Sequence, residues 1–494
     1  MNTSSPWESG QNQISFPRLD STLDVDVAII GGGITGIVTA YELAKAGKKV
    51  ALLEQGRLAE GASGWTTAFA TYVTDAPFLK LKKTVGAKRA TLAWNAGREA
   101  IDELERLIKA EKIDCDFMRC PAYVFAKDEQ ALEQLHREED AIKESGFRVK
   151  MDDAPLGFAT PGHMRVDRQA KFHPVKFLTG LAKAAEKHGA HIFENSKMES
   201  HAGSSPCVVK TKGGQLRATY VVLATHMPNG NPDLIAERIT AYQTYCLEAE
   251  IPKGILSEAL YWDTELPYHY FRVDAFPDHD RLMIGGEDHK TGQSEDANMH
   301  FAQMENFVKQ LLPGIEYNIS RHWSGEILQT IDELPFVGPT HRNKHVLMAT
   351  GFAGNGMTFG IASALILRDH ILGKKNPYAN ALRTLRFSGF FHYCERGYNY
   401  MKELVAGRMS QEKTTVDRIP AGEGAIVNID GKKVAVFRTP AGKLIKLSPV
   451  CTHLKCIVQW NNAEKTWDCP CHGSRFAKDG KVINGPAKKP LEKI

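Results

Sequence analysis

Two short segments near the end of the chain combine cysteine and histidine in a pattern that suits an iron-sulfur cluster. The first segment holds Cys451 and His453, and the second holds Cys469 and His472. Two thiolates on one iron and two imidazoles on the other form a [2Fe-2S] centre that is less negative than a four-cysteine centre, with a reduction potential of about −150 to +300 mV. Such a centre accepts one electron readily, and these four residues are its candidate ligands.

Zinc is the alternative, because cysteine and histidine also build tetrahedral structural zinc sites. Paired zinc ligands usually leave roughly two to four residues between them. A single residue separates Cys451 from His453, which suits a short loop that presents a thiolate and an imidazole to different irons. The spacing therefore favours [2Fe-2S] over zinc.

Residues 417–494, which contain both segments, resemble a Rieske [2Fe-2S] domain, specifically the disulfide-bearing kind of the respiratory cytochrome complexes. The resemblance implies that the four residues bind the cluster, that Cys456 and Cys471 form a disulfide between the loops, and that Ser474 donates a hydrogen bond to a cluster sulfur. Gly485-Pro486 is similar to the family's third loop, which shields the cluster. Because a disulfide is unusual in the cytoplasm, we expect this one to resist reduction through burial.

Two positions depart from the Rieske pattern and bear on the reduction potential. Lys455 stands where the disulfide-bearing proteins usually have glycine, and Phe476 stands where high-potential members carry a tyrosine whose hydroxyl bonds a ligand sulfur. A missing donor destabilises the reduced, more negative cluster. We therefore predict a potential below that of the respiratory proteins.

The residues before the cysteines predict a small β domain. Two apolar, partly alternating runs at 424–429 and 432–438 flank Asp430-Gly431, and this pattern is a strong signal for a hairpin. An all-β Rieske domain at the C-terminus agrees with that pattern.

The other end of the chain carries a dinucleotide-binding pattern. An apolar run at 25–30 leads into Gly31, Gly33 and Gly36, and the next apolar run ends at Glu54. The first glycine permits a tight turn, the second lets the backbone approach a pyrophosphate at a helix N-terminus, and the third allows close helix packing. Glu54 would bind ribose hydroxyls. The fingerprint alone fits FAD or NAD, and a glycine-rich turn without a ligand is the other interpretation.

Three later segments favour FAD. A small polar loop at 61–68 could wrap a second stretch of cofactor, a buried-strand pattern at 220–224 runs into a turn, and residues 346–360 predict a strand, a glycine loop and a helix start. That helix N-terminus could stabilise the anionic reduced flavin ring through its unpaired N–H groups and dipole. The candidate cofactor-binding residues in these segments are Ser63, Thr66, Thr67, Ala224, Gly351, Gly354, Gly356, Met357 and Thr358.

These segments, within residues 24–372, resemble the D-amino-acid oxidase and glycine/sarcosine oxidase superfamily of FAD enzymes. The resemblance implies an α/β FAD-binding domain of the Rossmann-like, doubly wound type, with an inserted antiparallel β substrate domain at about 239–329. Some relatives attach flavin covalently through a histidine or cysteine in the loop near Ser63. Neither residue occurs between Gly61 and Thr71, so we predict a dissociable flavin.

The inserted sheet holds the candidate substrate residues. Alternation along a strand would put Tyr270 and Arg272 on one face. Arg272 could bind a substrate carboxylate through two parallel hydrogen bonds while Tyr270 shapes the pocket. The other interpretation of Arg272 is a surface ion pair with an acid.

Composition limits the remaining functions and the location of the protein. The chain of 494 residues has a formal net charge of +4, which gives no reason to invoke nucleic acid.

Residues 1–23 are polar, without an apolar signal region, so we expect a flexible N-terminal segment and a cytoplasmic protein. The stretch at 346–367 is too interrupted for a transmembrane segment. Residues 373–416 are predicted to form a helical, aromatic linker that docks on the flavoprotein core or, alternatively, contacts a membrane surface or partner.

The two cofactors together predict a dehydrogenase. We expect FAD to oxidise a C–N bond of a small-molecule amine or amino acid and to pass electrons one at a time through the Rieske cluster. The partner would be an external one-electron acceptor such as a cytochrome, a ferredoxin or a quinone-linked carrier. The alternatives are an electron-transfer component without an organic substrate of its own, and a redox sensor that uses Cys456 and Cys471.

Overall fold

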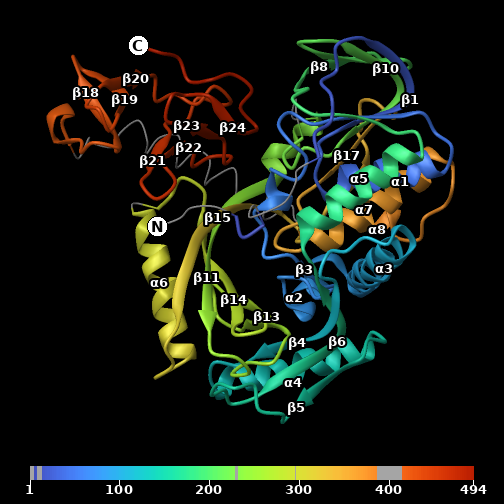
Figure 1. Cartoon of the computed structure of the whole chain (residues 1–494), viewed down its shortest axis with the longest axis vertical. Helices are drawn as coiled ribbons and strands as arrows, with labels where there is room; N and C mark the ends of the chain where they lie inside the picture. Colours follow the sequence, from blue (N-terminus) through green and yellow to red (C-terminus); the bar gives the residue numbers. More distant parts are fainter. Residues whose placement is uncertain (1–4, 8–13, 229–231, 295, 387–413) are drawn as a thin grey trace.

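The computed structural model describes residues 5–7, 14–228, 232–294, 296–386 and 414–494. Two large sheets with their helices form most of the molecule, and a smaller β region at the C-terminus sits beside the second sheet (Figure 1). This arrangement confirms the predicted fold class, with an α/β domain, an added antiparallel sheet and a C-terminal all-β domain.

The first sheet is the doubly wound part of the fold. Its main path runs β16-β17-β10-β1-β2-β7, in which β17, β10, β1, β2 and β7 are parallel. Val27 and Ile29 are fully buried, as expected for strands covered on both faces. The strands are β1 (Thr22–Ile30), β2 (Val50–Leu53), β7 (His191–Phe193), β8 (Met198–Ala202), β9 (Cys207–Thr211), β10 (Gln215–Leu223), β16 (Phe336–Pro339) and β17 (Val346–Thr350).

The register of this sheet aligns the ends of three parallel strands. Ile30 at the end of β1 lies opposite Leu53 of β2 and Leu223 of β10. The residues that follow these strands therefore meet at one edge, where open α/β sheets bind their ligands. Helices α1 (Ile34–Lys45), α3 (Ala87–Glu111), α5 (Pro174–Lys187) and α7 (Gly356–Ile371) cover one face of the sheet and share its core with Val27 and Ile29, whereas Ala28 and Ile30 belong to a separate core on the other face.

The second sheet has nine strands in the order β15-β11-β14-β13-β12-β4-β6-β3, with β5 paired to β6. Its strands are β3 (Phe69–Ala70), β4 (Met118–Phe125), β5 (Val149–Asp152), β6 (His163–Lys171), β11 (Ile239–Ile251), β12 (Leu260–Asp263), β13 (Tyr270–Ala275), β14 (Asp280–Lys290) and β15 (Asn318–Thr330). The predicted range of 239–329 for this sheet was incomplete, since β12 pairs in parallel with β4 and thereby joins strands from 69–171. Such a pairing between distant segments leaves no local pattern in the sequence.

Shorter helices complete this part of the molecule. Helix α6 (Ala297–Leu311) packs on β11 and β14. The others are α2 (Phe78–Val85), α4 (Glu129–Glu144) and α8 (Ala379–Leu382), with 3-10 turns η1 (Ala62–Gly64), η2 (Pro232–Arg238) and η3 (Val416–Arg418). No helix in the described ranges is long and apolar enough to cross a membrane.

The C-terminal region consists of two small antiparallel sheets. One contains β18 (Gly424–Ile429), β19 (Lys432–Arg438) and β20 (Leu444–Leu447), and the other contains β21 (Gln459–Asn461), β22 (Thr466–Asp468), β23 (Arg475–Ala477) and β24 (Val482–Asn484). The predicted hairpin is present, with Asp430 and Gly431 both at positive φ in its turn. The region lies against the end of α6 and β15 (Figure 1).

The two segments predicted to connect or extend the domains have different outcomes. Within the N-terminal segment, Trp7 is 2% exposed and its indole N–H donates to Thr66 O at 2.7 Å, so this part is packed rather than flexible. Apolar burial of a tryptophan outweighs the polar character of its neighbours. Most of the predicted aromatic linker, at 387–413, lies outside the described residues.

Candidate flavin, substrate and cluster sites

The glycines of the fingerprint are placed as close packing requires. Gly31 follows β1 at φ +114°, and a Cβ there would lie 2.2 Å from Ala224 O. A Cβ on Gly36 would lie 1.9 Å from Gly31 O, so only glycine lets α1 approach the turn. Gly33 precedes α1, and Ser63 Oγ accepts a hydrogen bond from Ile34 N at 3.0 Å beside it. This cradle fits the pyrophosphate of a dinucleotide.

Glu54 lies at the end of β2, on the same edge. Its Oε2 accepts a hydrogen bond from Gly32 N at 2.7 Å, and its Oε1 accepts one from Gly56 N at 2.9 Å. Burial raises the pKa of the Glu54 carboxyl, and these amide donors oppose that rise. These bonds fix the carboxylate in the cavity wall. Binding of ribose hydroxyls by Glu54 stays a prediction.

A cavity of about 1760 Å³ runs from this edge to the second sheet. Pockets for single small ligands are about 300–1,000 Å³, so this one has room for a dinucleotide and a substrate together. The predicted cofactor residues that line it are Gly31, Gly33, Glu54, Ser63, Thr66, Thr67, Ala224, Gly354, Gly356 and Met357. Gly36, Gly351 and Thr358 are not part of this lining.

The start of α7 faces the cavity, as the glycine loop predicted. Gly354 and Gly356 line the cavity, and Asn355 precedes the helix. Asn355 Nδ2 donates to Val73 O at 2.9 Å, which ties the loop to the segment after β3. The free N–H groups of the first turn present the positive end of the helix dipole to the cavity.

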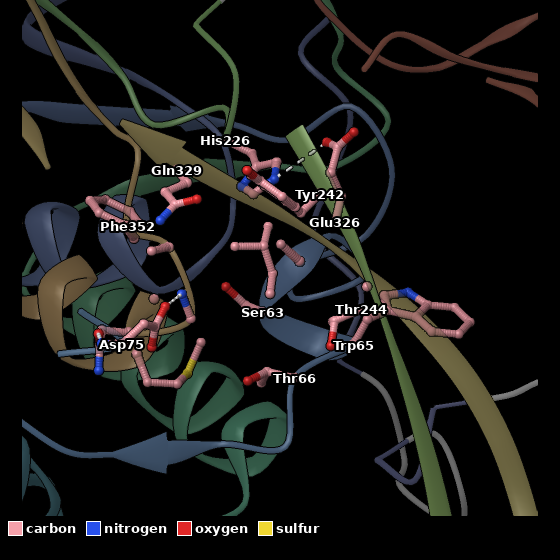
Figure 2. A pocket seen from close by; sticks show the side chains of 18 of the residues that line it. Ser63, Trp65, Thr66, Asp75, His226, Tyr242, Thr244, Glu326, Gln329 and Phe352 are labelled. Carbon is pink, nitrogen blue, oxygen red and sulfur yellow. Dashed lines mark hydrogen bonds and ion pairs between the residues drawn. The ribbon is translucent and has the colours of Figure 1, made fainter. Parts of the chain in front are cut away.

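Asp75 was not predicted, yet its side chain lines the cavity beside the loop before α7 (Figure 2). Its Oδ2 accepts a hydrogen bond from Gly354 N at 2.6 Å, and the Tyr268 hydroxyl is a second partner. Burial raises the pKa of Asp75 to about 6. Nothing in the local sequence marks this acid, because its importance depends on a contact between residues 75 and 354.

Asp288 on β14 is the second acid of the cavity. Its buried Oδ1 has no hydrogen-bond partner among the described residues, although the Thr244 hydroxyl bonds the carboxylate. Burial raises the pKa of Asp288 to about 7, and the charge of Asp75 contributes to the rise. The side chain therefore offers an acceptor oxygen to whatever enters the cavity.

Tyr270 lines the cavity as predicted, but Arg272 does not. The Tyr270 hydroxyl lies 3.3 Å from Thr244 Oγ1, and its ring contacts Phe69 edge to face. Arg272 instead bonds Asp274 Oδ1 through Nε at 3.0 Å and through Nη2 at 2.7 Å. The expectation that Arg272 binds a substrate carboxylate is therefore corrected.

The hydrogen bonds of Arg272 show why it does not reach the substrate pocket as predicted. Its Nη1 donates to three backbone carbonyls, those of Thr67, Ala68 and Phe172, and the residue is 2% exposed. A guanidinium that is saturated in this way joins the loop after η1 to the second sheet. Strand alternation gave the correct face but could not show how far along the strand the cavity extends.

The four predicted cluster ligands converge between two loops of the C-terminal region. Cys451 and Cys469 are 1% and 2% exposed, and the rings of His453 and His472 lie 5.1 Å apart between centroids. His453 Nδ1 is buried without a hydrogen-bond partner among the described residues. Two buried thiols beside two imidazoles, one of them with an unsatisfied nitrogen, fit a [2Fe-2S] cluster with mixed ligation.

Two further contacts hold the loops over the cluster site. Cys456 and Cys471 form a disulfide with a Cα–Cα separation of 6.5 Å, as the resemblance implied. Ser474 Oγ accepts a hydrogen bond from Ala487 N at 3.0 Å in the third loop, so its hydroxyl proton remains available to Cys451, a neighbouring partner. The third loop is thus tied to a cluster-binding loop.

The structure shows the environment of the two residues that depart from the Rieske pattern, Lys455 and Phe476. Lys455 adopts φ +65°, the left-handed region that glycine occupies without strain, which explains why glycine is usual here. Phe476 is fully buried within the C-terminal core and brings no hydroxyl to the cluster. The prediction of a lowered potential rests on this missing donor.

The cluster-binding loops dock on the second sheet. A Cβ on Gly473, next to the ligand His472, would lie 2.2 Å from Ala241 Cβ on β11. Asn484 Nδ2 donates to Glu326 Oε2 at 3.3 Å on β15.

Glu326 also forms an ion pair with His226 at 3.4 Å, at the other end of the cavity from Asp75 (Figure 2). The same sheet therefore lines the flavin cavity and receives the cluster domain.

Comparisons with known proteins agree with this geometry. Residues 26–370 match the family described as FAD dependent oxidoreductase, and residues 411–494 match the Rieske [2Fe-2S] domain. The chain is 33% identical to YhfW of Bacillus subtilis (strain 168), whose name describes a Rieske 2Fe-2S iron-sulfur protein, over 99% of this chain and 97% of that protein. These matches establish FAD and a [2Fe-2S] cluster as the cofactors.

Other relatives match one part of the chain. Gamma-glutamylputrescine oxidoreductase of Escherichia coli (strain K12) is 25% identical over 79% of this chain and 92% of its own length. The cytochrome b6-f complex iron-sulfur subunit of Chlorobaculum tepidum is 41% identical over 19% of this chain and 46% of that protein. Glycine oxidase from Geobacillus kaustophilus has a similar fold, with a TM-score of 0.62, 22% identity and coverage of 74% of this chain and 99% of that one.

Proposed function

We propose that this chain oxidises a C–N bond and delivers the electrons through its cluster to an external one-electron acceptor. The chain belongs to the FAD dependent oxidoreductase family and also contains a Rieske [2Fe-2S] domain. The observation that carries this proposal is the docking of the cluster-binding loop at Gly473 on Ala241. Because β11 and β15 also line the flavin cavity, the two cofactors of one chain would face the same sheet.

The chemistry divides between the two cofactors. Bound FAD would accept a hydride from the carbon next to nitrogen, and the cluster takes electrons one at a time. In this oxidation a C–H bond breaks, a C=N bond forms, one proton leaves the amine, and two electrons leave the substrate. An acceptor that takes two single electrons restores the enzyme.

The residues of this chain hold and shield the reaction site. The N-terminus of α7 offers N–H groups to a flavin that gains negative charge. Gly354 N–H and the Tyr268 hydroxyl orient Asp75, which can accept the proton that the amine loses. Tyr268 and Tyr270 cover the site with aromatic surface and exclude water from it.

An anaerobic experiment tests this function directly. Amines, N-methyl amines and amino acids would be mixed with the holoenzyme while flavin bleaching and the Rieske EPR signal are recorded together. The proposal predicts bleaching by a specific amine compound, followed by the EPR signal of the reduced cluster. Response only to NADH or a protein donor would indicate an electron-transfer component instead.

A His472→Ala variant supplies the control. Loss of a ligand should remove the Rieske signal, while the substrate should still bleach the flavin because His472 belongs to the C-terminal region. Reduction of an added cytochrome or ferredoxin should then stop. Continued reduction of that acceptor by the variant would show that the cluster is not on the electron path.

A further inference from the structure

The reaction end of the cavity carries negative charge. Asp75 and Asp288 both line it. A chain of contacts connects them, because the Tyr268 hydroxyl bonds Asp75 and the rings of Tyr268 and Tyr270 lie 5.6 Å apart. The Tyr270 hydroxyl lies 3.3 Å from Thr244 Oγ1, and Thr244 bonds Asp288. Asp288 Oδ1 is buried and has no hydrogen-bond partner among the described residues. A buried acceptor oxygen without a donor lowers stability unless a ligand satisfies it.

No ion pair among the described residues joins Asp75 or Asp288 to a lysine or arginine of the lining. Arg475 is the single arginine there, and it pairs with Glu464 and with Asp468 in the C-terminal region. Lys80 at the rim pairs with Glu333 at 2.9 Å. An α-amino acid would bring a carboxylate that needs such a partner.

The other lysines of the described lining also lie away from the acids. Lys465 pairs with Glu423 in the C-terminal region. Lys488, in the third loop, lies close enough to His201 on β8 for its charge to lower the pKa of that imidazole. Lys197 immediately precedes β8. Lys197 and Lys488 therefore lie at the side of the cavity formed by β8 and the third loop, whereas Asp75 contacts the loop before α7.

Aromatic side chains complete the acidic end. The rings of Tyr268 and Tyr270 lie 5.6 Å apart, and Phe69 meets Tyr270 edge to face at 5.6 Å. Aromatic faces attract cations and also contact alkyl chains. Carboxylates and aromatic walls together suit an ammonium group that is attached to an apolar chain.

We propose that the substrate is an alkylamine cation without a carboxylate on its reacting carbon, and that Asp75 and Asp288 bind its ammonium group. This substrate class rests on the proposed function, since it assigns a specificity to the same site. The acids exclude α-amino acids by repulsion, because the substrate carboxylate would be a third in a space that already holds two.

Binding to the oxidised holoenzyme tests the class without any turnover. Pentylamine and norleucine are a matched pair, because norleucine is pentylamine with a carboxylate on the carbon that bears nitrogen. Each would be titrated anaerobically while the visible flavin spectrum is followed. We expect pentylamine to bind at least tenfold more tightly than norleucine. Equal binding, or tighter binding of norleucine, would overturn the proposal.

Substitution then assigns the preference to the acids. Asp288→Asn should weaken pentylamine binding at least tenfold and leave norleucine binding unchanged or stronger. Glu250→Gln makes the same change at an exposed acid of β11 and should alter neither. Flavin content and the Rieske EPR signal report whether each variant is intact. If Asp288→Asn does not fold, the comparison of the two ligands on the natural protein still decides the matter.

The outcomes separate this inference from the proposed function. Bleaching of flavin by norleucine but not by pentylamine would reject the substrate class and keep the oxidoreductase function. A strong preference for pentylamine with no bleaching by any amine would keep the cation site and reject amine oxidation.

Discussion

Asp288 is the residue whose titration should be visible in ligand binding. Burial and the neighbouring Asp75 raise its pKa to about 7, while the charge of His269 opposes that rise. A carboxyl with a raised pKa is neutral below that value and charged above it. Since an alkylamine stays protonated throughout this range, binding of the cation should strengthen as the pH rises through about 7.

Pentylamine titrations at a series of pH values check this expectation. The dissociation constant should fall across the titration of Asp288, and the fall should be absent in Asp288→Asn. Asp75, Glu287 and His269 also act on this carboxyl, so the midpoint belongs to the group as a whole. A dissociation constant that does not change with pH in the natural protein would contradict the assignment.

Phe476 is the residue that we hold responsible for a lowered reduction potential. It is fully buried beside the cluster loops and carries no hydroxyl. Phe476→Tyr should raise the potential if the new hydroxyl donates to a ligand sulfur, and Ser474→Ala should lower it by removing a donor. Protein-film voltammetry measures both shifts. A potential at the top of the Rieske range in the natural protein would refute this account.

At the scale of elements, the docking of the C-terminal region on β11 should control electron transfer. Ala241 Cβ faces Gly473 at the contact. Ala241→Leu adds bulk to a packed interface, which typically costs about 1–3 kcal/mol. Displacement of the cluster should slow flavin-to-cluster transfer severalfold, because the rate of electron tunnelling falls steeply with distance.

Stopped-flow absorbance and EPR distinguish this effect from general damage. Flavin bleaching by substrate and the shape of the Rieske signal should stay unchanged in Ala241→Leu, with only the appearance of the reduced cluster delayed. Ala202→Leu places the same bulk at an exposed position of β8 and should have no effect. Unaltered cluster reduction in Ala241→Leu would place the electron path elsewhere.

Elements also show which features the sequence could predict. The glycine fingerprint and the two cluster loops are contiguous segments whose chemistry depends on local spacing, and the structure brings their residues together. The nine-stranded sheet, the role of Asp75 and the burial of Arg272 depend instead on contacts between segments far apart in the chain. Local periodicity gives the face of a strand but not its neighbours.

At the scale of the whole molecule, the chain places both cofactor sites against one sheet. The FAD cavity lies between the two large sheets, and the cluster loops contact β11 and β15 from the other end of the cavity. A flavin can hold one electron or two and the cluster holds one, so this pair can divide a two-electron oxidation into single-electron steps. On the proposed function, this arrangement predicts that the flavin reduces the cluster of its own chain.

The rate of cluster reduction after a single anaerobic pulse of amine tests this account most directly. Freeze-quench EPR would follow the reduced Rieske signal at several protein concentrations, with substrate saturating. We predict that the signal follows flavin bleaching at a rate independent of protein concentration. A rate that rises in proportion to protein concentration, or a bleached flavin with no Rieske signal, would contradict electron transfer from the flavin to the cluster of the same chain.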